Sequence, residues 1–148
     1  MSLAAAMAVA LGPWLGLIEA ESVRAHVDPA TLTAIVYHES HGQPSRIYQE
    51  RDGDCSVGLA QVKVKSCDAA RVASLLVPAT NIRAAATILR ATRRWCVRHP
   101  SDRYCRAGNR VFPGGGAANR YAGATTKFAL ELAPMRKQAR ALLRRRSH

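Results

Sequence analysis

Aromatic residues and metal-binding cysteine motifs are scarce in this sequence. Phe, Trp and Tyr make up only 5% of the 148 residues, so the core must consist mainly of Ala, Leu, Val and Ile. None of the four cysteines belongs to a Cys-x-x-Cys pair, the spacing of many zinc and redox sites. There is no internal repeat and no linker. We therefore expect one domain without a metal or a cofactor.

The N-terminus lacks the basic residues that usually begin a secretory leader, because the first Arg is Arg24. Its apolar run is interrupted at Gly12-Pro13 and is too short, as an unbroken stretch, to span a bilayer. We interpret residues 1–13 as an apolar lead-in or the remnant of a leader, and regard an uncleaved anchor as the less favoured alternative.

Acidic residues are nearly absent from the second half of the chain. Residues 1–70 hold 5 Lys/Arg and 8 Asp/Glu, whereas residues 71–148 hold 17 Lys/Arg and 2 Asp/Glu. Such a basic half favours an anionic partner, although a solvated face without any partner gives the same pattern. Residues 134–148 suit either docking on anionic envelope polymers or lipids, or a helix that closes the domain. Nucleic acid is a less favoured partner, because the sequence contains no nucleic-acid-binding motif.

The four cysteines fall into two pairs of short separation, Cys55 with Cys67 and Cys96 with Cys105. Two local disulfides fit this arrangement and would place the protein in an oxidising compartment. The alternative is four buried free thiols in a cytosolic protein.

The pattern of apolar residues predicts a mainly α-helical fold with at most a small β element near residues 43–64. Residues 43–56 are polar and turn-rich, so we expect a loop or an irregular hairpin. Residues 57–64 are compatible with either a strand or the start of a helix. Asn81 is interpreted as a helix N-cap, and residues 100–118 as a loop. Pro134 is expected to kink or break the last helix. The predicted helices are 14–27, 29–40, 82–99 and about 125–146.

Glu39 stands near the end of the second predicted helix, which Asp28-Pro29 begins as N-cap and first residue. Leu32, Val36 and Glu39 share one helical face, so the carboxyl extends an apolar stripe. Partial burial and the negative end of the helix dipole both favour a protonated carboxyl there, the form that a general acid requires. A surface Glu that pairs with Arg46 is the ordinary alternative.

Three short motifs in order carry a resemblance to a known family. "YHES" contains Glu39-Ser40, "SVGLAQ" contains residues 58–61, and "NRYAGA" contains residues 121–123. Together with the helical segments "DPATLTAIVYHES" and "NIRAAATILR", they resemble the lytic transglycosylase (SLT-like, goose-lysozyme-like) domain of the lysozyme superfamily. The resemblance covers roughly residues 14–133. Two positions depart from the family pattern, Ala60 in place of Met and Ala122 in place of Asn.

The resemblance implies a single lysozyme-like domain that cleaves the β-1,4 bond between N-acetylmuramic acid and N-acetylglucosamine in peptidoglycan. Glu39 would be the one catalytic acid and base, and a 1,6-anhydro ring would form on the muramic acid. The residues that the resemblance assigns to substrate binding are Ser40, Ser56, Gly58, Leu59, Gln61 and Tyr121.

Two other functions remain open. A second acid among Glu50, Asp52 and Asp54 would activate water and make the protein a muramidase, although a solvated Asp-Gly turn explains these acids more simply. A non-catalytic basic module that binds the envelope is the other alternative. In every case we expect a monomer, located in the periplasm, outside the cell, or encoded by a phage and released to the wall. His38 and His41 flank Glu39 without the spacing of a zinc protease.

Overall fold

Helix α3 (Pro29–Ser40) lies at the centre of the structure, a computed structural model that describes residues 1–148. It begins as predicted, because the Asp28 side chain accepts hydrogen bonds from the backbone N–H groups of Ala30 and Thr31. Every residue from 30 to 37 is buried. The helix is therefore covered on all sides, and Glu39 does not merely extend one apolar stripe. This burial is possible because Ala, Leu, Ile, Val and Tyr cover most of the helix, and the buried Thr33 hydroxyl donates a 2.7 Å hydrogen bond to the Pro29 carbonyl.

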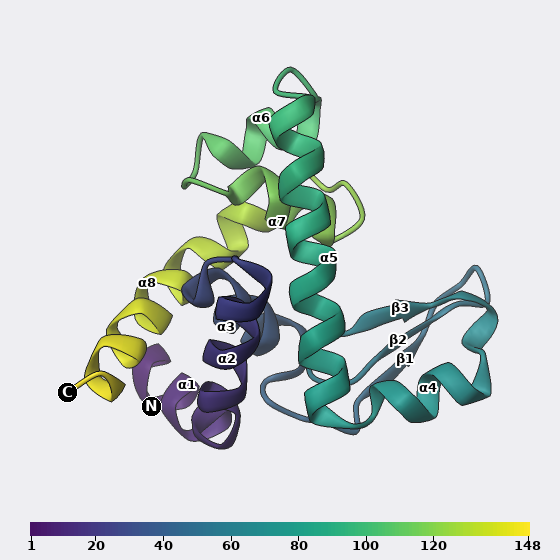
Figure 1. Ribbon diagram of the computed structural model, residues 1–148, viewed down its shortest axis with the longest axis horizontal. Helices are drawn as coiled ribbons and strands as arrows, with labels where there is room; N and C mark the ends of the chain where they lie inside the picture. The colour runs from purple at the N-terminus through teal and green to yellow at the C-terminus, as the bar shows by residue number, and fades with distance from the viewer.

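The remaining helices surround α3 and a long neighbouring helix, α5 (Figure 1). α5 runs through the middle of the molecule, with α1, α2, α3 and α8 on one side and the sheet with α4 on the other. Helices α6 and α7 lie near the C-terminal end of α5. Their bounds are α1 Leu3–Leu11, η1 Gly12–Trp14, α2 Leu15–Ala25, η2 Lys65–Cys67, α4 Ala69–Leu75, α5 Pro78–Arg98, α6 Arg103–Asn109, α7 Gly115–Tyr121 and α8 Phe128–Arg146.

The expected small β element is an antiparallel sheet in the order β1-β2-β3. Strands β1 (Ile47–Gln49) and β2 (Cys55–Val57) form a hairpin whose turn contains Asp52-Gly53. Strand β3 (Val62–Val64) pairs with β2 in turn. The ambiguous segment 57–64 is thus neither one strand nor a helix. It is the end of β2, a turn and β3, because Gly58 and Gln61 both adopt positive φ angles between the strands.

Asn81 is not a helix N-cap. Helix α5 begins earlier, at Pro78, and Asn81 is fully buried inside it. Its Nδ2 donates to the carbonyls of Val57 (2.7 Å) and Leu75 (2.9 Å), and its Oδ1 accepts from the N–H of Ala60 (2.9 Å). This buried amide joins the end of β2, the β2–β3 turn and the end of α4 to α5, and it supplies partners to three buried backbone groups, which require hydrogen bonds.

The N-terminal residues differ from the loose lead-in expected from sequence. α1 packs against α8 and α3, and its Met7 and Leu11 side chains are fully buried. Leu3–Ala25 is, by length and composition alone, long and apolar enough to cross a membrane, whereas from the sequence we expected the run to be too short; 22% of its most apolar window is buried. The 3-10 turn η1 stands where Gly12-Pro13 interrupts the run.

Residues 100–118 are not a loop, because they contain α6 and the first residues of α7. Asp102 caps α6 by accepting from the N–H groups of Tyr104 and Cys105. The two short helices pack so closely that a Cβ on Gly108 would lie 2.2 Å from the Gly115 carbonyl oxygen. The glycines here allow the two helix backbones to come into contact, whereas in the sequence they led to the prediction of a loop. Helix α8 continues through Pro134 rather than ending there.

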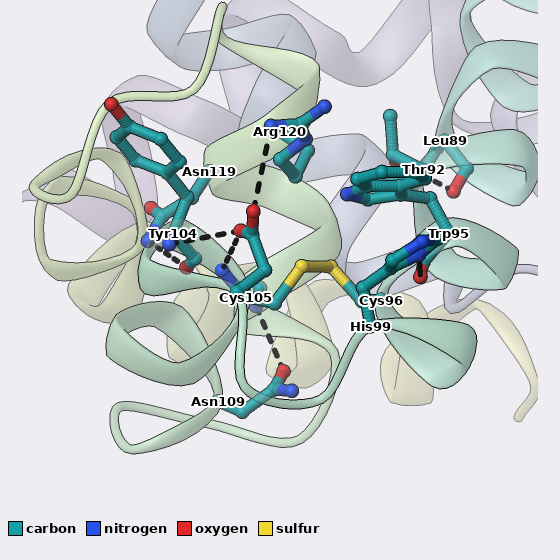
Figure 2. The surroundings of a disulfide bond; sticks show 12 residues. Leu89, Thr92, Trp95, Cys96, His99, Tyr104, Cys105, Asn109, Asn119 and Arg120 are labelled. Carbon is teal, nitrogen blue, oxygen red and sulfur yellow. Dashed lines mark hydrogen bonds and ion pairs between the residues drawn. A yellow bond between two sulfur atoms is a disulfide. The ribbon is translucent and has the colours of Figure 1, made fainter.

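Both cysteine pairs form disulfides, Cys55–Cys67 and Cys96–Cys105, and no cysteine is free. The first links β2 to the end of η2 beside the sheet. The second joins the last turn of α5 to α6, where Asn119 of α7 also hydrogen-bonds the Tyr104 carbonyl (Figure 2). One disulfide therefore holds η2 against the sheet, and the other holds α6 against the end of α5.

We predict that Asn81→Ala lowers the free energy of unfolding by about 3 kcal/mol, because it removes three buried hydrogen bonds to the backbone. Urea denaturation at neutral pH measures this. Asn109→Ala is the matched control. Asn109 is exposed and its side chain accepts one bond, from the Gly116 N–H, so we expect a loss of about 1 kcal/mol or less. Equal losses for the two variants would contradict the role of Asn81.

Reduction should destabilise the protein, because each disulfide closes a short loop and restricts the unfolded chain by roughly 2–3 kcal/mol. Thermal melts with and without reductant test this, and the absence of free cysteines makes the disulfides the only thiol-sensitive groups. The double variants Cys55→Ala/Cys67→Ala and Cys96→Ala/Cys105→Ala separate the two contributions. An unchanged melting temperature in reductant would refute the expectation.

Candidate active site

A cleft of about 480 Å³ separates the sheet from the helices and collects residues from distant parts of the chain. It contains Glu39 from α3, Gln61 from the β2–β3 turn and Tyr121 from α7. The full set of lining residues is His38, Glu39, Glu50, Ser56, Gln61, Lys63, Tyr121, Ala122, Gly123, Thr125 and Phe128. Residues of all three sequence motifs therefore meet in one cleft.

Glu39 is the penultimate residue of α3 and points into the cleft from the buried centre of the fold. Its side chain is 24% exposed. No protein group donates a hydrogen bond to its carboxylate, and its one charged neighbour is the His38 ring, with Nδ1 at 3.8 Å from Oε1. An accessible carboxyl on a rigid helix end, with no hydrogen bond as short as 3.5 Å from the protein, can exchange a proton with a bound ligand.

His38 is a cleft residue that the sequence did not single out as functional. Its Nε2 lies 3.0 Å from the Glu131 carboxylate of α8, and its ring meets the edge of Phe128 with centroids 4.9 Å apart. Glu39 first, and then Glu131, hold the pKa of His38 above its ordinary value, against the opposing effect of burial. His38 thus stands between two carboxylates, a position that depends on α8 and has no signal in the local sequence.

Tyr121 connects the third motif to the second. Its hydroxyl donates a 2.8 Å hydrogen bond to the Ala60 carbonyl. Burial, with a smaller contribution from the Glu39 charge, raises the pKa of the Tyr121 phenol, so the hydroxyl keeps its proton. Its oxygen lone pairs remain available to accept a hydrogen bond in the cleft.

Gln61 is held rigidly by its own backbone and side chain. It has a φ of 49°, and its Nε2 donates to the carbonyls of Gly58 (3.0 Å) and Arg46 (3.1 Å). Both amide hydrogens are therefore occupied, which leaves Oε1 as the group that a ligand hydroxyl or N–H can reach.

Three of the residues assigned to substrate binding lie behind the cleft wall rather than on it. Ser40 is buried, and its hydroxyl donates to the Val36 carbonyl and accepts from the Gly42 N–H, which ends α3. Leu59 is fully buried in the core. A Cβ on Gly58 would come within 2.2 Å of the Asn81 amide. These residues shape the site without contacting its open space.

The three candidates for a second acid are in different settings. Glu50 lines the cleft and accepts a 2.8 Å hydrogen bond from Ser56, another predicted site residue. Asp52 and Asp54 do not line it, and their carboxylates face the Lys63 ammonium at 3.2 and 3.5 Å. Among the three, only Glu50 can meet a ligand in the cleft.

Several lining residues were missed by sequence reasoning, namely His38, Lys63, Thr125 and Phe128. Thr125 and Phe128 follow the third motif closely, so proximity to "NRYAGA" is the signal that could have found them. The structure contains no group of three His, Cys, Asp or Glu side chains able to hold a metal ion.

Comparison with known proteins gives one match. A family model described as "Transglycosylase SLT domain" matches residues 16–99, which is more than half of the chain and includes Glu39 and Gln61. Neither the curated proteins nor the solved structures contain a match to this chain.

The raised pKa of His38 predicts a pH dependence of stability. Because the folded state binds the His38 proton more tightly than the unfolded state, this stabilisation is complete below the unfolded pKa of about 6.5 and disappears as the pH rises through the folded pKa. Urea denaturation of the wild type and His38→Gln between acidic and mildly alkaline pH measures it. We expect the difference in unfolding free energy to shrink as the pH rises. Parallel curves would contradict the assignment, and His148→Gln is the control.

Proposed function

The chain belongs to the transglycosylase SLT domain family, and on that premise we propose that it is a peptidoglycan lytic transglycosylase. Members of this family act on peptidoglycan in the cell envelope. The proposed reaction cleaves the β-1,4 bond between N-acetylmuramic acid and N-acetylglucosamine and leaves a 1,6-anhydro ring. The observation that carries the proposal is the accessible Glu39 carboxyl, which has only the His38 ring as a charged neighbour and shares one cleft with Gln61 and Tyr121.

Glu39 carries both proton transfers in this reaction. Its carboxyl first donates a proton to the glycosidic oxygen, and the N-acetyl group of the substrate stabilises the cationic carbon that results. The Glu39 carboxylate then removes the proton of the sugar's 6-hydroxyl, whose oxygen bonds to that carbon and closes the ring. The proton lost in the first step is recovered in the second, so no water is consumed.

The cleft supplies polar groups to hold the sugars near Glu39. The Gln61 Oε1 accepts from a sugar hydroxyl or acetamido N–H, because its own amide hydrogens are bound to the backbone. The Tyr121 hydroxyl is fixed by Ala60 and offers its oxygen to the ligand. Ser40, Gly58 and Leu59 support these groups from behind the wall.

A second candidate, a muramidase, is favoured by one observation. Glu50 lines the same cleft and is positioned by Ser56, so it is the acid among the three that would activate a water on the opposite face of the sugar. We rank this reaction second, because Glu50 already accepts a 2.8 Å hydrogen bond from Ser56, whereas the nearest charged group to Glu39 is the His38 ring at 3.8 Å. The non-catalytic envelope-binding module is the third alternative.

We place the protein in the periplasm, outside the cell, or in a phage-encoded product released to the wall, because two disulfides suit an oxidising compartment. The basic residues 134–148 are proposed to contact anionic envelope polymers or lipids. Arg144 and Arg145 form no ion pair, whereas Arg146 pairs with Glu19 at 2.6 Å. We expect the enzyme to be a monomer that needs no cofactor.

The decisive measurement is mass spectrometry of products released from purified peptidoglycan. We expect anhydro-muropeptides, which are lighter by one water than reducing-end products. Glu39→Gln should reduce turnover by about a thousandfold or more, because the amide cannot exchange the proton, while wall binding is retained. Glu50→Gln removes the other cleft carboxyl and should change turnover far less.

Two other outcomes would support the alternative functions. Reducing-end products that disappear in Glu50→Gln would establish the muramidase. Binding without any product, from the wild type as from Glu39→Gln, would leave the envelope-binding module.

A further inference from the structure

A second hollow, of about 600 Å³, lies between the end of α2 and the C-terminal half of α5. It shares no lining residue with the cleft of Glu39. Its wall consists of four arginines, one histidine and one valine, namely His26, Arg90, Arg93, Arg94, Val97 and Arg98. No carboxylate lines it, so its positive charge is not neutralised from within.

Arg93 is held in place by the backbone across the hollow. Its Nη1 donates a 2.8 Å hydrogen bond to the carbonyl of His26, the residue that ends α2 with a φ of 56°. The left-handed conformation at His26 turns the chain toward Val27 and α3. One wall of the hollow is therefore preorganised, which reduces the entropy lost when a ligand is bound.

The other arginines of this hollow differ from Arg83 on the same helix, because they have no carboxylate partner. On the N-terminal part of α5, Arg83 shares the buried Glu21 carboxylate with Arg24. By contrast, Arg90, Arg94 and Arg98 form no ion pair. They follow one another at four-residue intervals on one helix, an arrangement in which like charges repel. An anion bound among them would relieve that repulsion.

We propose that this hollow, named here the arginine pocket, binds a phosphate-bearing anion. The planar guanidinium group presents paired N–H donors that match two phosphate oxygens, and four such groups converge here. The volume exceeds the needs of one phosphate and suits a diphosphate or a phosphorylated lipid headgroup. Val97 is 74% exposed within this basic wall and gives an apolar contact that a lipid can use.

The observations favour these ligands over nucleic acid. No Phe, Tyr or Trp side chain lines the arginine pocket, so it lacks the large aromatic platforms on which single-stranded binding proteins stack bases. A purely structural role, in which Arg94 and Arg98 compensate the negative end of the α5 dipole, explains their place in the last turns. It does not explain the tethered Arg93 or the hollow, and it predicts no response to added anions.

The test compares two double variants that lose the same charge. Arg94→Gln/Arg98→Gln alters the arginine pocket, whereas Arg106→Gln/Arg110→Gln alters exposed arginines of α6 and its C-cap, which form no ion pair and lie outside the pocket. Pyrophosphate is titrated by calorimetry and by thermal shift at physiological ionic strength, so that weak surface attraction is screened. Flotation with vesicles of zwitterionic lipid, with and without phosphatidylglycerol, forms the second arm.

We expect pyrophosphate or the anionic vesicles to bind the wild type and the α6 control equally. The pocket variant should bind about tenfold more weakly, the effect of losing one charge-assisted hydrogen bond. Binding to pyrophosphate alone identifies a free phosphate compound as the source. Binding to the anionic vesicles identifies a lipid headgroup. Either result supports the proposal.

Three results would overturn it: equal weakening in both double variants, no binding of either probe, or tighter binding of duplex DNA with the same dependence on the pocket arginines. If the glutamine variant does not fold, Arg94→Lys/Arg98→Lys keeps the charge and should still weaken binding, because the paired donors are lost. Cleavage of a soluble glycan fragment should be unchanged in the pocket variant, so this test is independent of the proposed reaction.

Discussion

The buried carboxamide of Asn81 is the interaction on which the cleft depends. It binds the carbonyl of Val57 and the N–H of Ala60, so the β2–β3 turn is attached to α5 at two points, and a third bond to the Leu75 carbonyl attaches the end of α4. Ala60 in turn accepts the Tyr121 hydroxyl through its carbonyl, and Gln61 follows directly. The Asn81 side chain does not reach the cleft, yet through Ala60 it positions two cleft residues of the motifs, Gln61 and Tyr121.

The third of them, Glu39, is positioned by a different constraint. Helix α3 is enclosed by the rest of the helical body, and only its C-terminal end opens toward the sheet. A carboxyl near the end of a fully packed helix cannot move far, since core packing resists displacement. His38 and Glu131 add a polar connection from α3 to α8 beside it. The site therefore consists of a rigid helix end facing a rigid turn.

The basic character of the second half of the chain is distributed over separate surfaces rather than one. Arg83 joins α5 to the buried Glu21 and contributes to the fold. The arginine pocket lies farther along the same helix, and α8 carries another group of cations, Arg144, Arg145 and Arg146, in its last turn. Net charge alone does not distinguish these roles, because neutralisation depends on which carboxylates fold against each helix.

Features that depend on neighbours in sequence followed from the sequence alone. The Asp28-Pro29 start of α3, the Asp-Gly turn and the two cysteine pairs rest on local backbone preferences and short loops, whose cost in entropy is small. The family resemblance assigned Glu39, Gln61 and Tyr121 to one site, and all three line one cleft in the structure. The tertiary structure decided the rest. From the sequence Asn81 is predicted to be a helix cap, because its partners Val57 and Ala60 lie 24 and 21 residues away. Likewise, His38 meets Glu131 across 93 residues and Arg93 meets His26 across 67, because packing of distant helices, and not local preference, brings such groups together.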